Sequence, residues 1–246
     1  MAYQITGTPQ NTEIGVILPT YGEAENIANL IEDIENLGLN TQILVIDDSS
    51  PDGTATVVQE KQKKYPNLLL YSRPKKTGLG TAITDGFKIY LSAQNPPKYV
   101  FTMDADYSHN PQDIPKLLAV MHESDCAIVI GSRYSKGGKI QGWPLTRKII
   151  SKTANTIARA LLGLKLQDCT AGFRCYSTTF LREAISSLHS TTYEIQIETV
   201  RQASLRNFVV KETPVLFVNR KQGKSKLAWG EIKSFLTYTI RAVWRS

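Results

Sequence analysis

Short apolar runs alternate along this chain with longer stretches whose apolar residues recur at helical spacing. The run from Glu13 to Leu18 predicts a buried strand. The next stretch has a helical period that ends at Gly38, with apolar positions Ile27, Leu30, Ile31, Ile34 and Leu37. The alternation continues with predicted strands at 42–46, 68–71, 99–103 and 127–130. The predicted helices between and after them are 56–65, one that ends near Ser92, about 111–122 and 145–162.

This alternation favours one class of fold. Strands that are each followed by a helix are typical of a doubly wound, mostly parallel sheet with flanking helices. We therefore predict an α/β catalytic domain over residues 1–226, a length that can bury a single core.

The last residues, 227–246, are predicted to form a separate amphipathic helix. Its apolar stripe holds Ile232, Phe235, Leu236, Thr239, Ile240 and Val243, and Lys233, Arg241 and Arg245 lie around the stripe. Such a helix suits a membrane surface, the core of its own domain or a small membrane partner subunit. The pattern leaves these three alternatives open.

Two aspartates follow the predicted strand 99–103 directly. Asp104 and Asp106 are separated by one small residue, at the edge of the sheet where ligands bind in open α/β folds. Two such carboxylates repel each other, and a divalent cation that carries a phosphorylated ligand explains why both stay ionised. An Asp-x-Asp in isolation fits a solvated turn equally well, so the metal interpretation depends on the neighbouring loops.

The other loops at this edge carry complementary chemistry. They comprise Pro19 to Glu23, the pair Asp47-Asp48, the turn from Lys75 to Gly80, and Arg133. Carboxylates can bind ribose hydroxyls or base N–H groups, and glycine allows the backbone to approach a ligand closely. Their shared location predicts a nucleotide site.

A second site for an anion is predicted beyond these loops. Arg147 and Ser151 lie four residues apart on the helix 145–162 and therefore share a face. The guanidinium fork matches phosphate oxygens, so this pair would make a good phosphate clamp. Without the neighbouring loops, an exposed arginine beside an exposed serine would fit the spacing better. Small-residue loops with an arginine at 131–133 and 171–174 point to the same anion pocket.

Charge and composition narrow the choice of partners. The net charge of +7 and a pI near 9.2 suit polyanionic ligands such as phosphates, anionic lipids or nucleic acid. No RNA-binding signature or helix-turn-helix accompanies the basic residues, which disfavours nucleic acid. The cysteines, Cys126, Cys169 and Cys175, are expected to be reduced thiols in a cytosolic setting. We expect no secretory signal and no membrane-spanning helix.

Taken together, the motifs resemble those of the polyprenyl (dolichyl) phosphate mannose synthases, which are inverting glycosyltransferases of family 2 with the GT-A fold. The resemblance runs from about residue 14 to about residue 227. Its motifs are Pro19-Thr20-Tyr21-x-Glu23, Asp47-Asp48-Ser49-Ser50-Pro51-Asp52-Gly53, Lys76-x-Gly78-Leu79-Gly80, Asp104-Ala105-Asp106-x-Ser108-His109, Gly131-Ser132-Arg133-Tyr134 and Thr170-x-Gly172-Phe173-Arg174.

The resemblance implies GDP-mannose as donor, a polyprenyl monophosphate as acceptor, and Mg²⁺ or Mn²⁺ as cofactor. By position, the metal ligands would be Asp104 and Asp106. Arg220 would bind the departing diphosphate, and the acceptor phosphate would be held by Arg133, Arg147 and Ser151. The donor would be bound by Pro19, Tyr21, Glu23, Asp47, Asp48, Gly78, Asp104, Ala105, Arg220 and Lys226. Such an enzyme would work peripherally on the cytoplasmic face of a membrane.

The chain also departs from the family pattern. Ser49 replaces a usual glycine, and Ser108 stands where some members have a metal-binding Gln. Thr192 to Gln196 matches a family segment only in part, which makes Gln196 and Glu198 tentative site residues. Transfer of glucose or another sugar from a UDP-sugar is the alternative reaction, and a non-catalytic sugar-nucleotide or nucleic-acid binding protein is a remote one.

The expected chemistry needs no general base. A phosphate monoester has a second pKa near 6, so the acceptor oxygen is already anionic at neutral pH. The histidines, His109, His122 and His189, have no triad-like setting in the sequence. Catalysis then consists of placing the acceptor oxygen in line with the anomeric carbon and neutralising the leaving group, with Asp106 essential.

Overall fold

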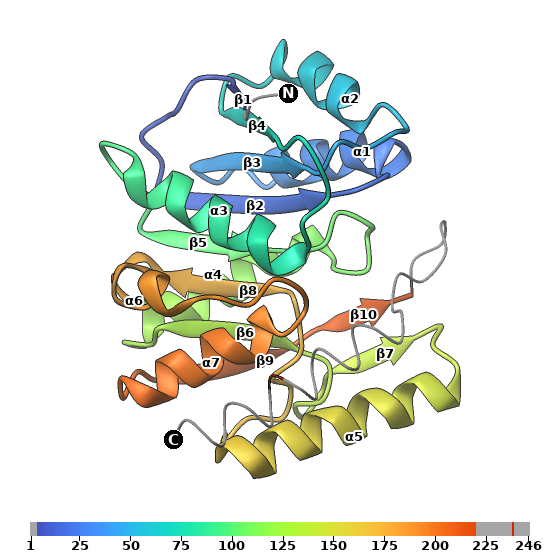
Figure 1. Ribbon diagram of the computed structural model, residues 1–246, viewed down its shortest axis with the longest axis vertical. Coiled ribbons are helices and arrows are strands. Elements are labelled where there is room, and N and C mark those ends of the chain that lie inside the picture. The colour runs from blue at the N-terminus through green and yellow to red at the C-terminus, as the bar shows by residue number, and fades with distance from the viewer. Residues whose placement is uncertain (1–3, 220–237, 239–246) are drawn as a thin grey trace.

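The computed structural model describes residues 4–219 and residue 238, and it contains one large sheet (Figure 1). The eight strands lie in the order β1-β4-β3-β2-β5-β8-β6-β9. Their bounds are β1 (Gln4–Thr6), β2 (Ile14–Thr20), β3 (Thr41–Asp47), β4 (Leu68–Ser72), β5 (Tyr99–Thr102), β6 (Ile128–Ser132), β8 (Arg174–Ser177) and β9 (Val210–Pro214). All pairings are parallel except those of β1 and β8.

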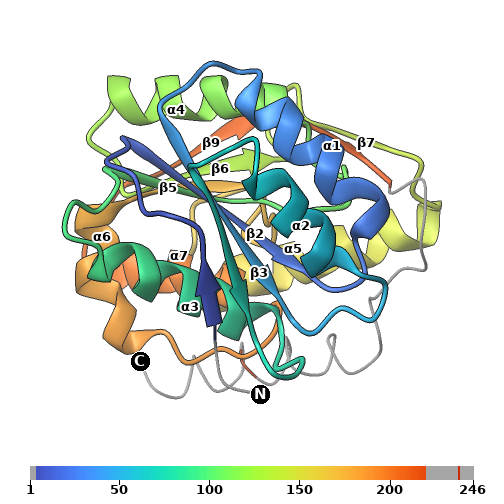
Figure 2. The same cartoon turned by 90° about the horizontal axis from the view of Figure 1, so that it is seen from above.

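Helices cover both faces of this sheet (Figure 2). One face packs against α1 (Ala24–Glu35), α2 (Thr54–Gln62) and α4 (Ile114–Glu123), and the other packs against α3 (Leu79–Ser92), α6 (Thr178–Ala184) and α7 (Ile195–Leu205). Short 3₁₀ turns, η1 (Pro111–Asp113) and η2 (Ile185–Ser187), precede α4 and follow α6. The sheet is therefore the buried middle layer, as expected for strands that are apolar on both faces.

The central strands are buried because alternate side chains enter opposite cores. In β2, Ile17 belongs to the cluster under α3, and Val16 and Leu18 belong to the cluster under α1 and α4. Helix α1 turns Leu30 and Ile34 toward that second cluster. Because both faces are covered, a continuous apolar run suits these strands better than a strict alternation does.

A smaller element extends the molecule beyond β9. Strands β7 (Lys139–Gln141) and β10 (Leu216–Val218) form a parallel pair, and α5 (Leu145–Leu162) follows β7. In Figure 1 this pair and α5 lie at the lower right and the bottom of the molecule. Strand β10 ends next to the loop that follows β5. There the Val218 N–H donates to the carbonyl of Ser108 at 3.1 Å.

The predicted α/β class and the mostly parallel sheet are confirmed, and the helix 145–162 has the predicted bounds. The prediction missed the antiparallel direction of β8, which places the start of that strand at the edge where its neighbours end. It also missed β1, β7, β9, β10, α6 and α7. Strands β1, β7 and β10 have three residues each, and α7 buries polar residues such as Gln196 and Glu198 together with apolar ones, so these elements show no clear hydrophobic period.

The three cysteines are free and buried. Burial raises the pKa of the Cys169 thiol to about 12, so the thiol stays protonated and unreactive. Cys175 shows the same direction of pKa shift for the same reason. These thiols are therefore core residues and are not nucleophiles.

Candidate active site

A pocket opens at the edge where the parallel strands end. It is lined by Pro19, Thr20, Tyr21, Glu23, Asp48, Lys76, Gly78, Leu79, Ala82, Asp104, Ala105, Asp106, Thr192 and Tyr193. These residues come from the end of β2, the loops after β2, β3, β4 and β5, the start of α3, and the segment before α7. The structure thus brings together most of the residues that were expected to bind the donor.

Asp104 and Asp106 lie on the floor of this pocket but differ in environment. The Asp104 side chain is partly exposed, whereas Asp106 is buried. Asp106 Oδ1 accepts the backbone N–H of Ser108 at 3.0 Å, which fixes the orientation of the carboxylate. The intervening Tyr107 has a φ of 58°, so the chain turns sharply between the second aspartate and α4.

The donor set fits a hard divalent cation. Two carboxylates face the same pocket, and in the described part of the chain the buried Oγ of Ser108, whose N–H binds Asp106, has no hydrogen-bond partner. Within residues 4–219, no group of three or more His, Cys, Asp and Glu side chains could hold a metal by itself. A cation at Asp104 and Asp106 would therefore complete its coordination with ligand oxygens or water, as Mg²⁺ and Mn²⁺ commonly do.

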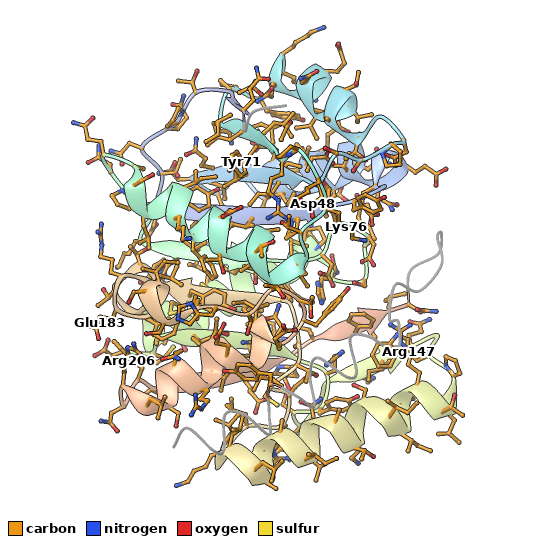
Figure 3. The ribbon with its side chains drawn as sticks, in the orientation of Figure 1. Asp48, Tyr71, Lys76, Arg147, Glu183 and Arg206 are labelled. Carbon is orange, nitrogen blue, oxygen red and sulfur yellow. The ribbon has the colours of Figure 1, made fainter. Side chains whose placement is uncertain are left out.

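The rim of the pocket presents an aromatic ring and a cation. The Lys76 ammonium lies 4.1 Å from the centre of the Tyr21 ring, and both residues line the pocket. In Figure 3, Lys76 and Asp48 are labelled close to each other, and Arg147 lies lower, toward the right of the molecule. A flat ring beside a positive charge suits a base and a phosphate of one ligand.

The two aspartates at the end of β3, Asp47 and Asp48, have different partners. Asp48 lines the pocket and forms a 2.5 Å ion pair with the buried Arg73. Asp47, in contrast, accepts hydrogen bonds from Thr20 Oγ1 and from the N–H and Oγ of Ser50, and it does not line the pocket. The oxygens of Asp47 hold the turn, and its expected role in binding the donor stays a prediction.

Arg73 is a residue that the sequence interpretation missed. It follows β4, and besides Asp48 it reaches Thr81 at 2.8 Å and Asp85 at 3.2 Å, both on α3. It therefore fixes the loop 75–80 against the pocket. Its place directly after a strand at the ligand edge is the signal that could have identified it.

The glycines of the loop 75–80 serve close packing within the protein. A Cβ at Gly78 would lie 2.2 Å from the carbonyl oxygen of Thr191, and one at Gly80 would lie 2.4 Å from that of Ser190. The N–H of Gly80 donates to Thr191 at 3.0 Å. Gly78 still lines the pocket, but its lack of a side chain is required by the segment 190–192, which was not part of the expectation.

Glu198 holds that segment in place. Its carboxylate accepts the N–H groups of His189 and Ser190 at distances between 2.9 and 3.1 Å. Glu198 is buried on α7. Its role in the structure is to fix the loop that packs on Gly78 and Gly80.

Arg133 follows β6 and is paired with a buried aspartate. Its Nε and Nη2 donate to the two oxygens of Asp168 at 2.7 and 2.8 Å, and Nη2 also reaches Thr170. Burial disfavours both charges, yet their mutual attraction raises the pKa of Arg133 and lowers that of Asp168. Among the described residues, Asp168 and Thr170 occupy Nε and Nη2 of Arg133, so its predicted role in holding a phosphate would fall to Nη1.

Arg147 and Ser151 lie on α5, on one side of the helix as predicted. The Arg147 guanidinium stacks on the Trp143 ring at 4.1 Å and donates to Asn219 at 3.2 Å. The hydroxyl of Tyr134 donates to Ser151 Oγ at 2.8 Å. Arg133 lies 5.5 Å from the centre of the same ring, so both arginines are close to Trp143.

His109 binds the backbone of the loop that carries Asp104 and Asp106. Its Nδ1 accepts the N–H of Asp104 at 3.2 Å, and its ring stacks on Phe173 and contacts Phe217 edge-on. Burial lowers the pKa of His109 to about 4, which keeps the imidazole neutral at physiological pH. Arg220 and Lys226, both expected near the donor, lie outside the described residues.

A mostly parallel sheet with a carboxylate pair at its ligand edge fits the GT-A class of glycosyltransferase. The chain belongs to glycosyltransferase family 2, whose family model matches residues 15–185. It is 37% identical over 220 residues to the polyprenol monophosphomannose synthase of Mycolicibacterium smegmatis, covering 89% of this chain and 82% of that protein. It is also 37% identical to an undecaprenyl-phosphate mannosyltransferase of Micrococcus luteus over 216 residues, covering 87% of each.

Solved structures confirm the fold. The glucosyl-3-phosphoglycerate synthase of Mycobacterium tuberculosis in complex with UDP gives a TM-score of 0.66 at 18% identity, covering 94% of this chain and 79% of that one. A mannosyltransferase of Pyrobaculum calidifontis in complex with GDP-Man and Mn²⁺ gives 0.61 at 15% identity, covering 96% and 67%.

Proposed function

We propose that this enzyme transfers mannose from GDP-mannose to a polyprenyl monophosphate, with inversion, to give polyprenyl phosphate mannose and GDP. The observation that carries the proposal is the placement of two groups of residues beyond one sheet edge. One is the pocket with its carboxylate pair, and the other consists of Arg133 after β6 with Arg147 and Ser151 on α5. The names of the two relatives at 37% identity support the same reaction.

On the donor side, Asp104 and Asp106 would hold Mg²⁺ or Mn²⁺ together with the diphosphate. The metal would neutralise charge on the departing GDP. Tyr21, Lys76 and Asp48 surround the remaining space of the pocket and would contact the nucleoside and its phosphates.

On the acceptor side, Arg147 and the Ser151 hydroxyl would orient the lipid phosphate, with Arg133 Nη1 beside them. The acceptor oxygen is anionic at neutral pH, so no side chain has to remove a proton. The protein then contributes position: it holds this oxygen on one side of the sugar and the diphosphate on the other.

Donor identity is tested by binding. Isothermal titration with Mn²⁺ is expected to show GDP-mannose binding more tightly than UDP-glucose, and an Asp106→Ala variant is expected to lose the Mn²⁺ dependence. Tighter binding of UDP-glucose would replace the proposed donor by the alternative one. Binding of neither sugar nucleotide would contradict a transferase of this kind.

We also propose that the enzyme works at a membrane surface through α5. Within the described part of the chain, no helix is long and apolar enough to span a bilayer. Helix α5, however, exposes Leu145 (71%), Ile149 (57%) and Ile150 (53%) on the helix that carries Arg147. An exposed apolar stripe with lysines around it is typical of a helix at the headgroup boundary.

Liposome co-sedimentation tests this surface. A double Ile149→Gln, Ile150→Gln variant is expected to bind vesicles of anionic phospholipid less than the unmodified protein does. Leu205→Gln is a matched control, because Leu205 is 58% exposed but ends α7 next to Arg206, at the opposite edge of the molecule (Figure 3). Equal loss of binding in both variants would contradict a role for α5.

For the segment 227–246, we propose docking on the catalytic domain itself. Tyr238, the described residue of that segment, is partly buried and packs against the apolar cluster shared with α3 and α7. A chain that ends at Lys226 should then unfold at lower temperature than the full chain. An unchanged melting temperature would favour the membrane or a partner subunit as the site of docking.

A further inference from the structure

The strand order leaves one position between the carboxylate pair and Arg133, where the transferred sugar could lie. Along the ligand edge the strands run β3, β2, β5, β8 and β6. The pocket loops follow β3, β2 and β5, and Arg133 follows β6. Between the carboxylate pair and Arg133 lies one strand position, the start of β8, which is at this edge because β8 is antiparallel to both neighbours.

That position is occupied by a glycine with polar groups around it. A Cβ at Gly172 would lie 3.7 Å from Asp104 Oδ1, 3.7 Å from Gln196 Nε2 and 3.7 Å from His109 Cε1. The carbonyl of Gly172 accepts the hydroxyl of Thr102 at 2.9 Å, which holds the residue in register with the end of β5. The missing side chain therefore leaves space next to a metal-site carboxylate.

Gln196 brings its amide group to this region, because its Nε2 is the atom 3.7 Å from the Gly172 Cβ position. The residue is 2% exposed, and its Oε1, on the same amide, is buried without a hydrogen-bond partner among the described residues. Its main chain is fixed, because its carbonyl accepts Arg174 Nη1 at 2.6 Å and Arg174 also binds the carbonyls of Cys169 and Ala171. A buried amide oxygen without a partner costs free energy unless a ligand satisfies it.

We propose that Gln196 hydrogen-bonds to a hydroxyl of the donor hexose and helps to determine which sugar is accepted. The inference rests on the proposed function, since it takes the diphosphate to lie at Asp104 and Asp106 and the acceptor phosphate to lie near Arg133. A carboxamide both donates and accepts, which suits a hydroxyl. Being neutral, it adds no negative charge beside the carboxylates and the acceptor.

The first test separates the sugar from the nucleotide. Gln196→Met keeps the size of the side chain and removes its polar atoms. In titrations with Mn²⁺, this variant is expected to bind GDP as the unmodified protein does and GDP-mannose roughly tenfold more weakly, the effect of one lost hydrogen bond. Gln202→Met, the same change farther along α7 and away from Gly172, is expected to leave both affinities unchanged.

Deoxy analogues make the test specific. Among GDP-mannose analogues that each lack one hydroxyl, one should bind more weakly than GDP-mannose to the unmodified protein but equally well to Gln196→Met. The inference is overturned if the variant binds GDP-mannose normally, if GDP and GDP-mannose weaken together, or if every analogue behaves alike in both proteins.

A second variant fills the space beside Gly172 and removes no polar group. The methyl of Gly172→Ala would make ordinary van der Waals contacts, so the fold and GDP binding should be unchanged while GDP-mannose binding weakens. Unchanged GDP-mannose binding would show that the sugar lies elsewhere. If the unmodified protein prefers UDP-glucose, the proposed donor fails, and the same comparison between UDP and UDP-glucose still decides the role of Gln196.

Discussion

Replacing Asp168 with Asn is expected to destabilise the protein strongly. Asp168 is fully buried, and its carboxylate accepts the Nε and Nη2 of Arg133 and also the backbone N–H of Arg133 at 3.0 Å. Asn keeps the shape but loses the charge, and its NH₂ group would face the guanidinium N–H groups. Breaking a buried ion pair from one side costs about 3–5 kcal/mol.

The magnitude can be measured in two ways. For a chain of this size, about 3 kcal/mol corresponds to a fall in melting temperature of roughly 6–12 °C. Urea unfolding followed by tryptophan fluorescence gives the free energy directly, and Trp143 lies next to Arg133. Glu60→Gln, which removes an exposed ion pair with Lys63, is the control and should leave the unfolding midpoint unchanged.

The pH dependence of the free energy of unfolding shows which ionisation state of Asp168 stabilises the fold. Because the pKa of Asp168 is lower in the folded state than its ordinary value, the ionised carboxylate stabilises the fold fully above about pH 5. This contribution is lost as pH falls through the lowered pKa. The difference in stability between the unmodified protein and Asp168→Asn should therefore be constant from about pH 5 to 8 and shrink below about pH 4.

Two results would refute this reasoning. An Asp168→Asn protein as stable as the unmodified one would show that the ion pair does not hold the loop before β8. A difference that grows toward acid pH would show that the carboxylate is protonated in the folded state. Removing both partners, in Arg133→Met with Asp168→Asn, should cost less than the sum of the two single changes.

Three further changes test other parts of the structure. Gly80→Ala should cost about 1–3 kcal/mol in thermal unfolding, because the methyl would press on the Ser190 carbonyl, and an unchanged melting temperature would show that the loop yields. Ser49→Ala should cost about 1 kcal/mol by losing the hydrogen bond to the Arg73 carbonyl, and Ser49→Gly should cost less because φ is 53° there; the reverse order would contradict this account. Arg147→Ala should raise the KM for the lipid acceptor roughly tenfold or more without changing the KM for GDP-mannose, and an equal change in both would place Arg147 on the donor side.

Strand ends could be located from the sequence because apolar runs stop where the polar loops begin. Asp104, Asp48 and Tyr21 each follow such a run within a few residues, so the parallel topology alone brings them to one pocket. The position of Arg147 and Ser151 on one helix followed from their spacing of four. These features depend on local periodicity and on the rule that parallel strands of one sheet all end at the same edge.

Pairing across distant segments could not be predicted in this way. The bond between Arg133 and Asp168 joins residues 35 positions apart, and the contact of Gly80 with Ser190 joins two loops through their backbones. Neither leaves a pattern in the local sequence. The same holds for Gln196, whose place beside Gly172 depends on the antiparallel direction of β8 and on the arginine that ties α7 to the preceding loop.

The central claim is that a metal-held GDP leaves one side of mannose while a lipid phosphate attacks the other. The most direct measurement incubates the protein with labelled GDP-mannose and Mn²⁺, and with either a polyprenyl phosphate or the corresponding polyprenol, and counts label extracted into organic solvent. We expect labelled lipid from the phosphate only, and none from an Asp106→Ala protein. Label in the polyprenol sample, none in the phosphate sample, or normal turnover by Asp106→Ala would contradict the account.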